Sequence, residues 1–222
     1  MCFTLDYWLY LCKVVGCSTG DPRTFYYQIL DMYRENRYTY HSFQSHVDPG
    51  FEHLDHWLSL ATFPEEREPT EQERAWTAIA WGCHDIMLGV EQSAMWTRRM
   101  LEKLGANPVA PLMGQALVKS TRHDFDERYP LSQVICDVDL LPLAVPWEEF
   151  HANFLRIREE YPGLTDQEYY AQRAEVLGKF AKRKKIYYLK GVQGQHESPA
   201  RYNITRMIEE ISACYPLAPR PT

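Results

Sequence analysis

The chain has 222 residues, a mass of 26.1 kDa and a formal net charge of -6, with 45% hydrophobic and 24% charged residues. A chain of this length can bury a full hydrophobic core, and its composition is that of an ordinary globular protein. The negative balance excludes a broad basic surface, so we expect no duplex nucleic acid as main partner. A local basic pocket for a phosphate is compatible with the same numbers.

The first 17 residues, MCFTLDYWLYLCKVVGC, are apolar enough to raise the question of a signal or membrane segment. Asp6 and Lys13 interrupt them, and no basic stretch precedes them, so we expect a packed amphipathic helix and no membrane partner. The six cysteines form no CxxC pair and no metal-finger spacing. This usage is typical of buried reduced thiols, which predicts a cytoplasmic protein.

Apolar residues recur at intervals of three and four along most of the chain, which favours an all-α protein. The clearest series is Trp76, Ile79, Ala80, Cys83 and Met87. A capping box marks two helix starts, because a Thr hydroxyl and a Glu carboxylate three residues later each accept a hydrogen bond from a free backbone N–H. The two boxes are Thr70 with Glu73 and Thr165 with Glu168.

Clusters of Pro, Gly and small polar residues divide the chain into about six to eight predicted helices. The breaks fall at residues 18–22, 63–70, 105–108, 128–130, 161–163 and 191–195. The segment SQVICDVDLLPLAV, 132–145, is the one β-like stretch, and a buried helix fits it equally well. We expect one helical domain over 1–215, with N-terminal helices in 1–30 packed on it and a short Pro-rich tail at 216–222.

His84 and Asp85 stand in the otherwise apolar run AIAWGCHDIMLG. His84 follows Ala80 by four residues, which places both on the inward face of a helix. Burying a carboxylate such as that of Asp85 costs several kcal/mol unless a cation or hydrogen-bond donors compensate. The pair therefore either hydrogen-bonds to its neighbours, as buried polar groups usually do, or binds a metal ion.

Two other segments add residues of the same kind. Half of the eight histidines lie within residues 37–57, namely His41, His46, His53 and His56. Asp137 and Asp139 lie inside the apolar run ICDVDLLPL. Two imidazoles and two carboxylates make a mixed N/O ligand set that suits one divalent ion, Mn, Fe, Co, Zn or Mg, with positions open for water.

This order of a His, then His-Asp, then a late Asp resembles the HD-domain superfamily, and more closely its group of predicted metal-dependent phosphohydrolases. The matching segments follow the order of that group over most of the chain: YRENRYTYHSFQSHV, AIAWGCHD, EQSA, LVKSTRHD, DVDLLPL, FLRIREEY, AQRAEVLGKFAKRKKIYYL and ESPARYNITRMIEEI. The segment between His-Asp and EQSA is shorter than in the group and has no Asn before Glu91. The resemblance implies an HD-domain-like helical bundle.

The resemblance also implies a set of metal ligands, namely His46, His84, Asp85 and Asp139. His46 is preferred as the first ligand because HVDPGFEHL matches the start of the first metal helix of the group, with His41 and His56 as alternatives. Asp139 is preferred to Asp137 because the final Asp of the superfamily stands next to a Leu on an apolar helix. Asp137 is then expected to orient the water or a ligand imidazole.

The activity implied by the resemblance is hydrolysis of a phosphoester in a small phosphorylated substrate, with a nucleotide as the first candidate. One divalent ion would activate a water, with Asp85 and Asp137 as the catalytic carboxylates. Phosphate also needs positively charged donors. The candidate substrate-binding residues are Arg37, His123, Arg173 and Arg201. The resemblance favours Arg173 and Arg201, because both lie at positions that the pattern of the group carries.

Two other functions stay open at this point. An HD-fold di-iron oxygenase needs further histidine ligands between the His-Asp and the last Asp, and His123 is the only histidine in that interval. A catalytically degenerate HD domain would serve as a ligand-binding module. The intact His-Asp and late Asp argue against this third function.

Overall fold

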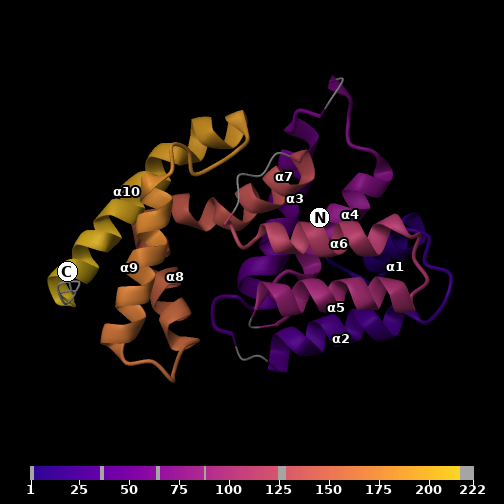
Figure 1. Cartoon of the computed structure of the whole chain (residues 1–222), viewed down its shortest axis with the longest axis horizontal. Helices are drawn as coiled ribbons and strands as arrows, with labels where there is room; N and C mark the ends of the chain where they lie inside the picture. Colours follow the sequence, from indigo (N-terminus) through magenta and orange to yellow (C-terminus); the bar gives the residue numbers. More distant parts are fainter. Residues whose placement is uncertain (1–2, 36–37, 64–65, 88, 125–128, 216–222) are drawn as a thin grey trace. The chain divides into compact units, whose positions relative to one another are not determined.

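The computed structural model describes residues 3–35, 38–63, 66–87, 89–124 and 129–215, and within these ranges the chain is all-α, without strands (Figure 1). Its α-helices are α1 (Leu5–Val14), α2 (Pro22–Glu35), α3 (Asp48–Leu60), α4 (Glu71–Cys83), α5 (Val90–Lys103), α6 (Val109–Ser120), α7 (Pro130–Leu140), α8 (Trp147–Glu159), α9 (Asp166–Lys182) and α10 (Lys190–Cys214). A turn of π-helix, η1 (Phe43–Val47), precedes α3, and a 3-10 turn, η3 (Leu141–Ala144), follows α7. The prediction of an all-α chain is therefore confirmed for the described residues, and the HD-domain-like bundle stays a prediction.

The prediction of six to eight helices was wrong, since the described residues form ten α-helices. Several breaks carry no Pro or Gly signal, and the break between α2 and α3 is one, because residues 36–47 contain neither. Met87, expected on the face of α4, lies beyond the end of that helix. The predicted break at 191–195 instead lies within the first turns of α10.

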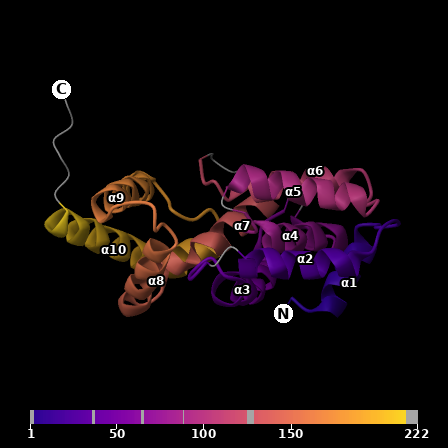
Figure 2. The ribbon, with the colours of Figure 1, turned by 90° about the horizontal axis from the view of Figure 1, so that it is seen from below.

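The chain divides into two compact units, residues 1–139 and 140–222. In the first unit, α4 packs against α1, α3, α5 and α6 (Figures 1 and 2). All residues from Thr77 to His84 are buried, so the last two turns of α4 are enclosed on every side. The first unit thus holds the end of α4 rigidly, and this end carries His84.

The second unit contains η3, α8, α9 and α10, and α10 packs against the other three. Buried Asn203 of α10 donates its amide to the carbonyls of Leu143 and Val145, at 2.9 and 2.8 Å.

The β-like stretch 132–145 is helical up to residue 144, as α7 followed by η3. The predicted single domain over 1–215 stays a prediction, and the tail 216–222 lies outside the described residues.

Helix starts follow the local chemistry that the sequence predicted. Thr70 accepts a hydrogen bond from the backbone N–H of Glu73, and the Glu73 carboxylate accepts one from Thr70. Thr165 and Glu168 form the same box at α9. Both capping boxes are thereby confirmed, and they set the first residues of α4 and α9.

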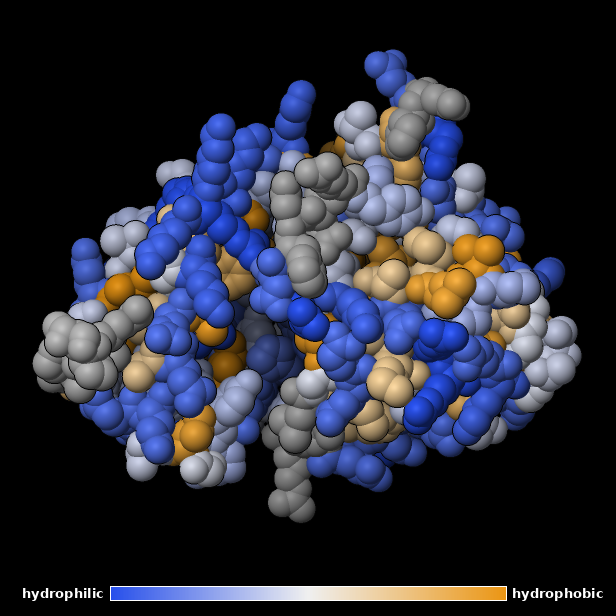
Figure 3. All heavy atoms as spheres, in the orientation of Figure 1, coloured by the Kyte–Doolittle hydropathy of each residue, from blue (hydrophilic) through white to orange (hydrophobic). Residues whose placement is uncertain are grey.

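The N-terminal amphipathic helix is confirmed as α1, whose Trp8, Leu11 and Cys12 are buried. None of the described helices is long and apolar enough to cross a bilayer. On the face drawn in Figure 3, hydrophilic residues dominate and hydrophobic ones form separate small patches. The five cysteines in the described ranges are free, and although three are buried, Cys214 is exposed.

Candidate metal centre

Four side chains of the first unit converge at the end of α4. His46 comes from η1, His84 is the C-cap of α4, Asp85 follows in the next turn, and Asp139 is the penultimate residue of α7. One nitrogen or oxygen from each of the four residues lies within 4.8 Å of those of the other three. Three separate segments thus deliver two imidazoles and two carboxylates to one point.

The spacing of these atoms fits ligands around a single ion. His46 Nε2 lies 3.2 Å from His84 Nε2 and 3.1 Å from Asp139 Oδ1, and His84 Nε2 lies 3.1 Å from Asp85 Oδ2. The remaining two His to Asp distances are 3.6 Å each. Adjacent ligands with bonds of about 2.1 Å lie roughly 3.0 to 3.4 Å apart in octahedral or tetrahedral geometry. The donor set therefore suits a divalent cation in both chemistry and spacing.

The tautomer of His84 directs a lone pair to the centre. His84 Nδ1 lies 2.6 Å from the carbonyl oxygen of Trp81, which accepts only, so Nδ1 carries a proton and donates it. In the neutral ring, Nε2 is then the unprotonated nitrogen that faces His46 and the carboxylates. A backbone carbonyl on the far nitrogen is the usual support of a metal-binding imidazole.

Trp81 joins the two segments that carry the histidines. Its ring stacks on His84 at 4.3 Å, and its Nε1 donates to the carbonyl of Val47 at 2.8 Å. The ring also lies so close to Gly50 of α3 that a Cβ there would come within 2.1 Å of Trp81 Cζ2. Gly50 thus permits the close approach of α3 and α4 that fixes His46 beside His84.

Tyr33 of α2 supports the backbone next to the carboxylate of the pair. The fully buried Tyr33 hydroxyl donates to the carbonyl of Gly82 at 3.3 Å and accepts from the N–H of Asp85 at 3.4 Å. Burial raises the pKa of Tyr33 well above its usual value, so the hydroxyl stays neutral. Asp85 is therefore held although it lies past the end of α4.

The electrostatics of the group favour a cation. Burial opposes charge on His84, but Asp85 and Asp139 raise its pKa well above the usual value. Burial also opposes ionisation of Asp85, yet His84 lowers the pKa of that carboxyl to about 2. Against burial, His123, His46 and His84 hold the pKa of Asp139 well below its usual range. Two partly exposed carboxylates are thus ionised side by side, and a divalent ion competes with the proton on His84 for them.

Among the described residues of the group, the carboxylates are more exposed than the histidines. The side chains of His84 and His46 are 1% and 4% exposed, whereas those of Asp85 and Asp139 are 23% and 17% exposed. The histidines therefore form the closed back of the centre, and the carboxylates face solvent. A water or a substrate oxygen must approach from the carboxylate side.

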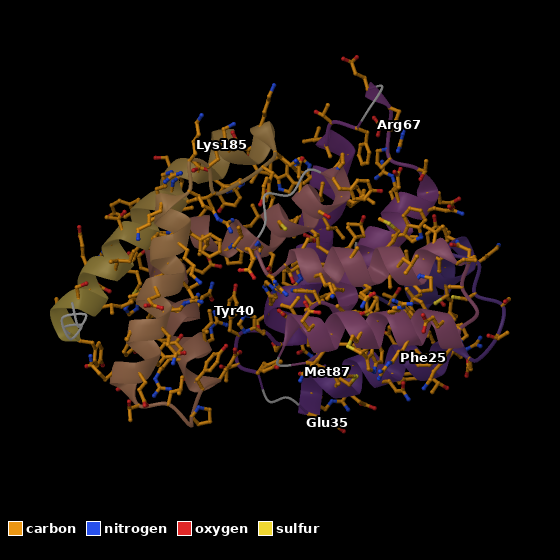
Figure 4. The ribbon with its side chains drawn as sticks, viewed as in Figure 1. Phe25, Glu35, Tyr40, Arg67, Met87 and Lys185 are labelled. Atoms are coloured by element: carbon orange, nitrogen blue, oxygen red, sulfur yellow. The ribbon has the colours of Figure 1, made fainter. Side chains whose placement is uncertain are left out.

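Two further histidines lie beside the carboxylates. His123, in the turn after α6, places Nε2 2.8 Å from Asp139 Oδ2. His41 is a charge neighbour of Asp85, and its ring lies 5.7 Å from that of His46. Tyr40, labelled in Figure 4, places its ring 5.3 Å from the His46 ring.

The structure separates the alternative ligands that the sequence left open. His46 belongs to the four-residue group and the alternatives His41 and His56 do not, since His56 is exposed on α3. Asp139 belongs to it, whereas Asp137 is fully buried and lies about 200° away around α7. The role of Asp137 in orienting water or an imidazole stays a prediction.

The predicted phosphate contacts are divided between the two units, and of the four only His123 is described beside the centre, next to Asp139. Arg37 lies outside the described residues, while Arg173 and Arg201 belong to the second unit. Arg201 donates to Glu197 and to carbonyls at the end of α9, and Arg173 lies 5.8 Å from the ring of Phe154. Both arginines thus have contacts within their own unit, and their binding of substrate stays a prediction.

Sequence reasoning missed Tyr33, Gly50 and Trp81 as supports of the centre. Trp81 alone had a local signal, because its carbonyl precedes His84 by three residues and so can accept from the imidazole. Glu91, in the EQSA segment, forms ion pairs with Lys119 and Arg122 at 2.7 Å each. It therefore links α5 to the turn that carries His123.

Comparisons of the chain with protein-family models, with curated proteins and with solved structures each found no match. The centre is accordingly defined by its own geometry, and membership of the HD-domain superfamily stays a proposal.

Proposed function

We propose that the chain is an HD-domain-like, metal-dependent phosphohydrolase that uses one divalent ion to hydrolyse a small phosphorylated compound, with a nucleotide as the first class to test. The observation that carries this proposal is the convergence of His46, His84, Asp85 and Asp139 with only the carboxylate side exposed. A closed ligand set would favour a structural metal, whereas an open side leaves positions for water and substrate.

When bound, the ion would supply a water of lowered pKa and stabilise negative charge on phosphoryl oxygens. The chain contributes the rest. His46 and His84 would hold the ion through their imidazole nitrogens, and Asp85 directs Oδ2 toward both imidazoles. We assign Asp85 as the catalytic carboxylate that accepts a hydrogen bond from the attacking water and orients it. Enclosure of α4 keeps these groups in place without reorganisation.

The experiment is metal analysis of the purified protein, combined with a phosphatase screen over nucleotides and sugar phosphates with added Mn²⁺, Co²⁺, Mg²⁺ or Zn²⁺. The test variant is Asp85→Asn. The matched control is Asp55→Asn, because Asp55 is an exposed carboxylate on α3 outside the group. We expect one ion per chain and a metal-dependent activity in the wild type and the control, with at least a hundredfold loss in Asp85→Asn.

The same experiment separates the alternative functions. Two irons per chain with an oxygen-dependent activity would select the HD-fold di-iron oxygenase. One bound ion with no turnover of any phosphoester would select a ligand-binding module. Absence of metal binding in the wild type would overturn both enzyme functions.

A further inference from the structure

The two oxygens of Asp139 are directed at different partners. Oδ1 faces the metal centre, 3.1 Å from His46 Nε2 and 3.6 Å from His84 Nε2. Oδ2 faces away from it and lies 2.8 Å from Nε2 of His123. Since the Asp139 carboxylate is ionised, it accepts this hydrogen bond and His123 Nε2 donates it. The carboxylate is thereby held at both ends, with one oxygen on each side.

His123 has an unusual backbone conformation for this contact. Its φ is +56°, in the left-handed region that glycine adopts without cost. Its side chain is only 10% exposed, so the ring is directed inward and not to solvent. Strained residues of this kind cluster at functional sites, where the surrounding structure holds them. Histidine is among the non-glycine residues enriched in this region, and here its ring is directed at Asp139.

The turn that carries His123 is braced against the neighbouring helices. Arg122 pairs with Glu91 of α5 at 2.7 Å and with Asp124 at 3.1 Å. The Cys136 thiol of α7 donates to the carbonyl of Ser120, the last residue of α6, at 3.1 Å. Ser120 lies three residues before His123, and Cys136 lies three residues before Asp139. This hydrogen bond therefore already joins the two segments that carry His123 and Asp139.

We propose that His123 is a positioning residue that restricts Asp139 to binding the metal ion through Oδ1 alone. This inference rests on the proposed function, and it gives His123 a different role from the phosphate contact expected from the sequence. One-oxygen binding keeps a coordination position open for the substrate. It also disfavours Ca²⁺, which takes six to eight oxygen ligands and readily accepts both oxygens of a carboxylate.

Three substitutions in the full-length chain test the contact. His123→Gly removes the donor and relieves the backbone strain. His123→Asn keeps a polar residue that tolerates the left-handed region but does not reach Asp139 Oδ2. His123→Gln restores the reach and the N–H donor. Binding of Mn²⁺ and Ca²⁺ alone is measured by calorimetry, and the visible absorption of bound Co²⁺ reports its coordination.

We expect Mn²⁺ affinity to fall about 10- to 100-fold in the Gly and Asn variants and to recover largely in the Gln variant. In the Gly and Asn variants only, the ratio of Mn²⁺ affinity to Ca²⁺ affinity should fall and the absorption spectrum of bound Co²⁺ should change. If the turn has only a structural role, the strain-free Gly variant should bind Mn²⁺ as tightly as the wild type does.

Mn²⁺ affinities of the Gly and Asn variants within about threefold of the wild type would overturn the role of His123 and leave the proposed function intact. If the Gly variant does not fold, the Asn and Gln pair decides the question alone, since equal affinities for these two would also overturn it. A wild type that binds none of the three ions would instead overturn the proposed function.

Discussion

Carboxylates lie at both ends of α4, but their negative charge is compensated to a different extent at the two ends. At the N-terminal end, Glu73 accepts two hydrogen bonds from Arg67 at 2.7 Å and further ones from Thr70. At the C-terminal end, Asp85 and Asp139 face imidazoles and no arginine or lysine among the described contacts. The first carboxylate is neutralised within the chain, whereas the second pair leaves negative charge in excess.

Helix polarity reinforces this difference. The positive N-terminal end of a helix favours Glu73, which thus needs only one cation, while the negative C-terminal end adds to the charge of Asp85 and favours a cation nearby. Within one fold, a carboxylate whose charge is paired by a cation of the chain indicates a structural role. A pair of carboxylates with excess negative charge and exposure to solvent indicates a binding site. Four substitutions test this contrast.

Asp139→Asn is expected to have the largest effect, because it removes both a ligand and one of the two carboxylate charges. The wild type should gain about 2.7 kcal/mol from Mn²⁺ at a hundred times its Kd, which is roughly 5 to 10 °C in Tm. The variant should gain nothing from Mn²⁺, and its metal-free form should melt below the metal-free wild type, because it loses a carboxylate whose pKa the imidazoles hold well below its usual range. Thermal denaturation with and without Mn²⁺ measures this, and an equal Mn²⁺ shift in the variant would contradict it.

Gly50→Ala should come next, because the added Cβ meets the ring of Trp81. We expect a loss of about 2 to 3 kcal/mol in the free energy of unfolding, together with weaker Mn²⁺ binding as His46 moves from His84. Gly178→Ala in α9 is the matched control, since nothing lies within 4 Å of its Cβ position. The control should gain about 0.5 to 1 kcal/mol, and chemical denaturation compares the two. A Gly50→Ala protein as stable as the wild type would disprove the close packing of α3 on α4.

Glu73→Gln should destabilise the protein by roughly 2 kcal/mol at pH 7 and leave Mn²⁺ affinity within about twofold. Hydrogen bonds from Arg67 lower the pKa of Glu73 from 4.5 to about 2. The folded state therefore binds its proton less readily than the unfolded state. The stability from Glu73 is full above pH 4.5 and is lost as the pH falls toward 2.

Urea denaturation of the wild type and of Glu73→Gln across this pH range should thus show a difference that narrows on acidification. A stability difference between the two proteins that does not change with pH would contradict this prediction. A Mn²⁺ affinity that falls in Glu73→Gln would show that the two ends of α4 are not separate in function.

Tyr33→Phe should have the smallest effect, about 1 kcal/mol in the free energy of unfolding, because it removes two long hydrogen bonds at Gly82 and Asp85. Mn²⁺ affinity should fall by less than about threefold, since the Asp85 side chain keeps its neighbours. Calorimetry of Mn²⁺ binding provides the measurement. A tenfold loss would mean that the backbone of Asp85, and not its packing, sets the geometry of the centre.

The features that the sequence predicted are those with a local cause. Thr70 and Thr165 start helices because the bonds that cap them lie within four residues. His84 was placed inward because helical periodicity assigned it to the face of Ala80. The β-like stretch 132–145 remained ambiguous because buried helices and buried strands are both apolar throughout, and the helix was decided by packing.

The features that escaped prediction depend on contacts distant in sequence. Nothing near Gly50 indicates that the ring of Trp81 packs on it, and nothing near Tyr33 indicates Gly82 and Asp85 as its partners. The helix count was too low because the turn through η1 has no Pro or Gly, although it carries His46. The left-handed φ of His123 is equally invisible in the sequence, since most residues in that region are glycine or asparagine.

The most direct test of the account is a crystal structure of the wild-type chain grown with Mn²⁺, with anomalous scattering used to locate the ion. The account predicts one ion per chain, within about 2.0 to 2.4 Å of Nε2 of His46 and His84, Oδ2 of Asp85 and Oδ1 of Asp139. An ion elsewhere, or no ion while the four side chains hydrogen-bond among themselves, would contradict the account.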